Sequence, residues 1–125
     1  MTARRILIID DEADVREIAK VSLEITKQWD VTTAASGEEG VALAATHRPD
    51  AILLDVIMPK VDGLATLIKL GENAETCHIP VILLTATLRL ATQPSFVAAG
   101  ARAVLVKPFD PGLLGGQIEL ALGWQ

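Results

Sequence analysis

The stretch Ile6-Leu7-Ile8-Ile9-Asp10-Asp11 is the most informative part of this chain, because three later stretches repeat its pattern. Each is a short apolar run that ends in a polar or charged side chain. Runs of consecutive apolar residues are typical of parallel strands that are buried on both faces. If all four runs are parallel strands, their polar ends converge at one edge of a sheet. The runs and the residues that follow them are 6–9 before Asp10 and Asp11, 51–54 before Asp55, 81–84 before Thr85, and 104–106 before Lys107.

The segments between these runs predict helices, so strands and helices alternate along the chain. Val15, Ile18 and Ile25 keep helical spacing within residues 13–27. Ser36 and Glu39 form a capping box that opens a helix reaching about residue 47. Five β–α units in sequence predict one doubly wound α/β domain with a five-stranded parallel sheet and helices on both faces. The remaining expected elements are a strand at 30–34, helices at about 64–70 and 94–99, and a last helix that Asp110 and Pro111 cap and that reaches residue 122.

The last of these helices contains three glycines. Gly112, Gly115 and Gly116 each weaken a helix by up to about 1 kcal/mol relative to alanine. We therefore expect packing or a partner to hold this helix.

Length and composition narrow the class of protein. At 125 residues the chain fits a single domain spanning 1–125 with no output domain. Charged residues interrupt every apolar stretch before it reaches the roughly 18 residues that span a bilayer. The first residues leave no room for a signal peptide. We therefore expect a cytoplasmic protein with no membrane partner. A single cysteine, Cys77, excludes an internal disulfide. The net charge of −5 and the 3% aromatic content argue against binding to nucleic acid.

Taken in order, the motifs at the ends of the apolar runs resemble those of response-regulator receiver domains, the phosphoacceptor half of two-component signalling. The resemblance covers about residues 5–122 and points to the stand-alone, chemotaxis-regulator-like type. It implies a flavodoxin-like strand order 2-1-3-4-5 and a cis peptide bond between Lys107 and Pro108. The matching pieces are Ile-Ile-Asp-Asp-Glu from residue 8, Leu-Leu-Asp-Val-Ile-Met-Pro-Lys-Val-Asp-Gly from 53, Leu-Leu-Thr-Ala from 83, Gly-Ala from 100 and Val-Lys-Pro-Phe from 106.

In that strand order Asp10, Asp11 and Asp55 crowd one edge of the sheet. Three carboxylates so close repel one another unless a cation neutralises them. Hard oxygen ligands with few protein contacts suit Mg²⁺. We assign Asp11 as a direct ligand, Asp10 as bound through water and Asp55 as bridging metal and phosphoryl group, with the backbone carbonyl of Ile57 as a further ligand. The Asp55 carboxylate is then the nucleophile that forms an acyl phosphate.

Thr85 and Lys107 complete the expected catalytic set. The strands that carry them lie about 4.8 Å and 10 Å beyond the strand of Asp55. A short hydroxyl suits the nearer place, whereas the farther one needs a long lysine. We expect Lys107 to pair with Asp55 at rest and with a phosphoryl oxygen afterwards.

Two positions depart from the receiver pattern. Val104 stands where the family usually carries an aromatic residue, whose ring turns inward when the threonine hydroxyl moves to the phosphoryl group. A valine has no ring to turn, so we expect the conformational switch to rest on Thr85 and the loop that follows it. Ile57 cannot orient an attacking water, which predicts a long-lived phosphorylated state.

These residues predict a response regulator. It takes a phosphoryl group from a histidine kinase or phosphotransfer protein onto Asp55, signals to a downstream protein, and does not turn over a small metabolite. The alternatives are a Mg²⁺-dependent aspartyl-phosphate phosphohydrolase, against which Ile57 argues since such enzymes place a second acid there, and a phosphorylation-independent binding module. A flavin-phosphate module is disfavoured because Asp-Asp-Glu has the wrong charge for it. The helix at 94–99, the strand after it and the last helix carry few charges, which predicts either a protein contact, as a homodimer or a partner dock, or a set of core residues. The apolar candidates are Leu88, Leu90, Phe96, Val104, Leu113, Leu114 and Trp124.

Overall fold

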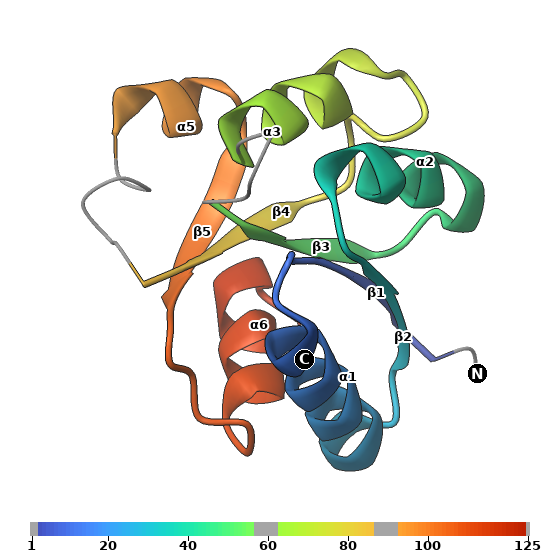
Figure 1. The fold of residues 1–125 in the computed structure, drawn as a ribbon, viewed down its shortest axis with the longest axis vertical. Helices are drawn as coiled ribbons and strands as arrows, with labels where there is room; N and C mark the ends of the chain where they lie inside the picture. The colour runs from blue at the N-terminus through green and yellow to red at the C-terminus, as the bar shows by residue number, and fades with distance from the viewer. Residues whose placement is uncertain (1–2, 57–62, 87–92, 125) are drawn as a thin grey trace.

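Strands and helices alternate along the chain, as the sequence predicts (Figure 1). The computed structural model describes residues 3–56, 63–86 and 93–124. The strands are β1 (Arg5–Ile9), β2 (Asp30–Ala34), β3 (Ala51–Asp55), β4 (Val81–Thr85) and β5 (Ala101–Val106). The helices are α1 (Ala13–Lys27), α2 (Gly37–His47), α3 (Gly63–Glu72), α5 (Pro94–Ala98) and α6 (Leu114–Leu122). No helix in the described ranges is both long and apolar enough to cross a membrane.

The five strands form one parallel sheet in the order β2-β1-β3-β4-β5, which confirms the expected topology. The register brings the strand ends together. Ile9 is opposite Leu54, so Asp10 and Asp55 follow at the same level of neighbouring strands. On the other side of β3, Asp55 is opposite Leu84, one residue before Thr85.

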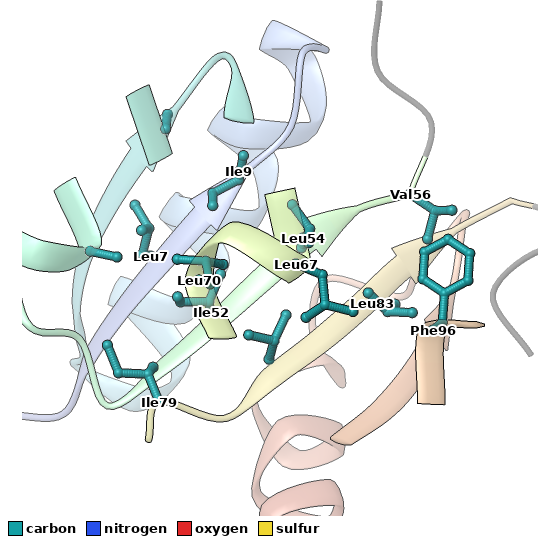
Figure 2. Close-up of a cluster of buried hydrophobic side chains, with 13 residues drawn as sticks. Leu7, Ile9, Ile52, Leu54, Val56, Leu67, Leu70, Ile79, Leu83 and Phe96 are labelled. Carbon is teal, nitrogen blue, oxygen red and sulfur yellow. The ribbon is translucent and has the colours of Figure 1, made fainter. Parts of the chain in front are cut away.

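Helices cover both faces of the sheet. Alternate residues of each strand point to opposite sides, so each face has its own apolar cluster. Leu7 and Ile9 of β1 belong to one apolar cluster, and Ile6 and Ile8 belong to another. Figure 2 shows the first cluster, with strand residues packed against Leu67 and Leu70 of α3 and against Phe96 of α5. The second cluster packs under α1 and α6 through Leu23, Leu114 and Ile118.

The capping box at the start of α2 is present. The Ser36 hydroxyl oxygen accepts a hydrogen bond from the Glu39 amide at 3.2 Å. The Glu39 carboxylate reaches back and accepts from the Ala35 amide at 3.1 Å. The first bond satisfies an amide that the first turn of a helix leaves without a partner, and the second ties Glu39 to the residue before the cap.

The expected cap of the last helix is wrong. α6 begins at Leu114, and the residue in the cap position, Leu113, makes no side-chain capping bond. The Asp110 carboxylate accepts instead from the Gly112 amide at 2.9 Å, and its carbonyl accepts from the amides of Leu113 and Leu114. Aspartate readily bonds the amide two residues on, and this local turn replaces a helical first turn at 110–113.

Candidate functional site

The polar residues that follow the strands meet at the carboxyl edge of the sheet. A carboxylate oxygen of each of Asp10, Asp11 and Asp55 can be chosen so that all three lie within 4.8 Å of one another. Asp10 and Asp55 are buried, whereas Asp11 is exposed. The structure thus brings together the three carboxylates that the sequence singles out.

Asp10 is held rigidly by the chain around it. Its Oδ1 accepts from the Glu12 amide at 2.9 Å, and its carbonyl accepts from the Arg16 guanidinium at 2.7 Å. Its Oδ2 is fully buried, and the Lys107 ammonium lies 2.8 Å from it. A buried carboxylate oxygen needs a counter-charge or hydrogen bonds in place of water, so Oδ2 is suited to an ammonium, to a metal cation or to water bound to one.

Lys107 crosses from β5 to these carboxylates. Its Nζ lies 2.8 Å from Asp10 Oδ2, 3.1 Å from Glu12 Oε1 and 3.6 Å from Asp55 Oδ1. The Lys107 amide also donates to the Thr85 carbonyl at 2.8 Å, and the Lys107–Pro108 peptide bond is cis, as the resemblance implies. The expected contact with Asp55 is present, but the ammonium lies nearer to Asp10 and Glu12.

The environment of Lys107 raises its pKa above the usual value of 10.5. Burial disfavours the charged form and by itself lowers the pKa. The hydrogen bond that the ammonium donates to Asp10, its charge attraction to Asp10 and to Asp55, and the hydrogen bond that it donates to Glu12 together outweigh burial. Lys107 is therefore an ammonium throughout the neutral pH range.

Glu12 is the member of the cluster that sequence reasoning did not assign. It follows Asp10 and Asp11 in the same acidic motif and stands immediately before α1. The sequence signal that could have identified Glu12 is its place as the third acid of that motif. A side chain at a helix start can turn back toward the strand end, but no pattern in the sequence showed that it does.

Thr85 ends β4 and is buried at that edge of the sheet. Ile57, whose carbonyl is an expected ligand, lies outside the described residues, as do Leu88 and Leu90. Val104 is half-buried on β5 and packs against the same cluster as Phe96.

Gly63 fixes the backbone beside the acceptor. A Cβ at this position would lie 2.6 Å from the Asp55 carbonyl oxygen and 2.7 Å from Val56 Cα, closer than atoms can approach. The Gly63 amide donates to the Val56 carbonyl at 2.8 Å. Only glycine lets α3 begin against the end of β3.

The residues present fit a divalent cation such as Mg²⁺. They supply hard carboxylate oxygens close enough together to share one ion, and one of them, the buried Asp10 Oδ2, already lies 2.8 Å from a positive charge, the Lys107 ammonium. Mg²⁺ prefers oxygen ligands and keeps several waters, so a site with few protein ligands suits it.

An apolar pocket of about 380 Å³ opens beside Lys107. Val15 and Ile18 of α1 line one side and Phe109 the other, with Glu12 and Lys107 at its polar end. α1 also exposes Ile18, Val21 and Ile25 to solvent.

The expected dimer face is only partly exposed. Phe96 and Leu114 are buried in the two clusters, and Val104 and Trp124 are half-buried. Leu113 is exposed, as expected. Three exposed apolar residues of the same elements were not foreseen, namely Val97, Val106 and Leu120.

Comparison with known proteins identifies relatives of this chain. A family model for the response regulator receiver domain matches residues 6–119. The chain is 40% identical over 106 residues to the DNA-binding dual master transcriptional regulator RpaA of Synechocystis, covering 85% of this chain and 44% of the relative. It is 40% identical over 117 residues to the response regulator PleD of Caulobacter vibrioides, covering 92% and 25%. The chain thus spans less than half the length of these two relatives.

Solved structures share the fold over nearly the whole chain. The chemotaxis response regulator CheY4 of Vibrio cholerae matches with a TM-score of 0.87 and 29% identity, covering 96% of this chain and 99% of that one. The receiver domain of the sensor histidine kinase PA1611 of Pseudomonas aeruginosa matches with a TM-score of 0.82 and 27% identity, covering 98% and 99%. That structure holds a magnesium ion in its active site cleft.

Proposed function

Because the chain belongs to the response regulator receiver domain family, we propose that it accepts a phosphoryl group on Asp55 from a histidine kinase or a phosphotransfer protein. It then signals through phosphorylation-dependent contacts with a downstream protein. The observation that carries this proposal is the buried Asp55 carboxylate, clustered with Asp10 and Asp11 and 3.6 Å from the Lys107 ammonium.

In the proposed reaction an Asp55 carboxylate oxygen bonds to the phosphorus of a phosphohistidine. The bond from phosphorus to the donor imidazole breaks, and its electron pair leaves with the imidazole, which takes up a proton. Lys107 stabilises charge on the phosphoryl oxygens, and the Thr85 hydroxyl donates a hydrogen bond to one of them. Positioning and charge stabilisation supply most of the catalysis in phosphoryl transfer.

The proposed cofactor is Mg²⁺, held directly by Asp11 and Asp55, through water by Asp10, and by the carbonyl of Ile57. When bound, it neutralises the charge that the carboxylates share with the phosphoryl oxygens. A water-mediated role for Asp10 is supported by the partners of its two oxygens, since Oδ1 accepts from the Glu12 amide and Oδ2 lies 2.8 Å from Lys107 Nζ.

The proposed partners are proteins. The apolar pocket beside Lys107 and the exposed apolar residues of α1 support docking of a protein donor next to Asp55. We propose further that the domain promotes only its own phosphorylation and slow hydrolysis, that it acts in the cytoplasm, and that a second copy binds the face formed by α5, β5 and α6.

The test is the intact mass of the protein after incubation with acetyl phosphate, with Mg²⁺ or with a chelator. We expect one phosphoryl adduct that requires Mg²⁺ and is absent in Asp55→Asn. Asp14→Asn is the matched control, because Asp14 is an exposed acid of α1 and not one of the three clustered carboxylates. No adduct on the wild type under either condition would contradict the proposal and favour a binding module that does not use phosphorylation.

A further inference from the structure

The Lys107 ammonium is drawn toward the α1 side of the site. It donates a hydrogen bond to Glu12 Oε1 at 3.1 Å and lies 2.8 Å from Asp10 Oδ2. Its distance to Asp55 Oδ1 is 3.6 Å, beyond ordinary hydrogen-bond length. The cation best placed to receive a phosphoryl oxygen is therefore held by other carboxylates.

Glu12 is built so that its side chain is available for this contact. Its amide is fixed by Asp10 Oδ1, and its carbonyl accepts from the Arg16 amide at 3.1 Å as α1 begins. Its side chain stands at the cap position but makes no capping hydrogen bond. Lys107 is the polar partner that the structure gives to this carboxylate.

The two ends of this ion pair differ in exposure. The Glu12 side chain is 60% exposed, whereas that of Lys107 is 11% exposed. An ion pair with an exposed partner is weak, because water and salt screen it. A weak contact cannot lock Lys107 in place, but it can bias which carboxylate the ammonium approaches.

We propose that Glu12 is a positioning residue that holds the Lys107 ammonium away from Asp55 and thereby slows phosphoryl uptake. This inference rests on the proposed function. Removing the Glu12 charge leaves Asp10 as the competing carboxylate and shifts the balance of the ammonium toward Asp55 and the arriving phosphoryl oxygens. It also removes one negative charge beside the entry of an anionic donor, and this second effect needs a control.

The test compares Glu12→Gln with Asp14→Asn, which removes an equal charge from the same helix start without touching Lys107. The measurement is the rate of phosphoryl-adduct formation with acetyl phosphate and Mg²⁺, followed by intact mass. We expect Glu12→Gln to be about two- to fivefold faster than wild type, the range that a partly exposed ion pair supports. Asp14→Asn should stay close to wild type.

Two further measurements show whether Glu12 acts through Lys107. In a Lys107→Met background, Glu12→Gln should give no gain beyond that of Asp14→Asn. In the absence of any phosphodonor, the NMR signals of the Lys107 side-chain Cε and Nζ should shift in Glu12→Gln and not in Asp14→Asn. If Glu12 had a purely structural role, the rate gain of Glu12→Gln would not depend on Lys107. Removing its charge would then not shift the Lys107 signals selectively. Urea unfolding of each variant confirms that the fold is intact, and Glu12→Ala serves as a second variant.

The outcomes separate this inference from the proposed function. If the wild type takes up the phosphoryl group but Glu12→Gln matches Asp14→Asn or is slower, the positioning role is wrong and the phosphoacceptor function stands. A gain that persists without Lys107 also overturns it. If the wild type forms no adduct at all, both proposals fail.

Discussion

The Lys107 ammonium balances carboxylates that burial would otherwise make costly. Asp10 is fully buried and Asp55 is 5% exposed. An ion taken out of water loses its solvation, and a buried charge is tolerated only when another charge or hydrogen bonds replace that solvation. Lys107 ion-pairs with both of these carboxylates and with Glu12.

Replacing this ammonium should make the cation-free protein less stable. We expect Lys107→Met to lower the free energy of unfolding in chelator by about 2–4 kcal/mol, since it leaves buried carboxylates without their counter-charge. Mg²⁺ should recover part of the loss by binding the folded state. Urea denaturation with chelator and with Mg²⁺ measures both effects, and Lys69→Met, at an exposed lysine of α3, is the control. Equal stability of Lys107→Met and wild type in chelator would contradict this account.

The raised pKa of Lys107 also predicts how stability depends on pH. A lysine with a higher pKa in the folded state contributes stability that is fully present below its unfolded value of 10.5 and is lost as the pH rises through the folded value. The difference in unfolding free energy between wild type and Lys107→Met should therefore be constant from about pH 8 to about pH 10 and shrink above that range. The chain has no tyrosine, so no phenol titrates in this alkaline range and adds to the measured difference. A difference that stays constant to strongly alkaline pH would show that Lys107 gains nothing from its carboxylates.

Among the elements, α6 shows how packing compensates a glycine-rich sequence. A Cβ at Gly115 would lie 2.6 Å from Lys27 Cγ, so the glycine lets the Lys27 stem cross the helix. Lys27 Nζ then reaches Glu119 at 2.6 Å, which joins α1 to α6. Leu114 and Ile118 are fully buried beneath. Packing, one of the two supports that the sequence predicts, thus holds this helix.

The two neighbouring glycines of α6 should respond differently to alanine. Nothing lies within 4 Å of a Cβ placed at Gly116, so Gly116→Ala should stabilise by about 0.5–1 kcal/mol through helix propensity. Gly115→Ala should give no stabilisation, because the new methyl displaces the Lys27 stem. Urea denaturation measures both, and Gly115→Ala with Lys27→Ala tests the cause, since shortening Lys27 should restore the gain. Equal gains at the two positions would contradict the packing argument.

Across the whole molecule, the two tryptophans gather at the end of the sheet opposite the site. Trp29 precedes β2 and Trp124 follows α6, and their rings meet edge to face with centroids 5.6 Å apart. The Arg4 guanidinium lies 3.9 Å from the centre of the Trp124 ring. This cluster joins both ends of the described chain. Both tryptophans lie far from Asp55, so their fluorescence is suited to following unfolding rather than phosphorylation.

The exposed apolar residues of α5, β5 and α6 predict self-association. Leu120 is 84% exposed and Val97 is 67% exposed, and exposed apolar groups on adjoining elements are typical of a protein contact. We expect the sedimentation mass to rise with concentration, and Leu120→Ser to weaken the rise while changing unfolding free energy by no more than about 0.5 kcal/mol. A monomer mass at every concentration, with and without phosphorylation, would remove the homodimer.

Local sequence patterns are enough to predict the sheet and the identity of the clustered groups. Apolar runs that end in Asp10, Asp55, Thr85 and Lys107 indicate buried parallel strands, and parallel strands align their carboxyl ends. The capping box of α2 was equally readable, because it depends on residues three apart. These features follow from local pattern and from strand geometry.

The partners of the long side chains are defined only once the chain is folded. Glu12 and Lys107 are 95 residues apart in the sequence, and their contact depends on where α1 begins relative to β5. The same holds for Lys27 lying over Gly115, and for which apolar candidates of the dimer face are buried, as Phe96 and Leu114 are. A flexible side chain has several carboxylates or surfaces within reach. Its choice is set by small energy differences among groups that only the folded chain brings together.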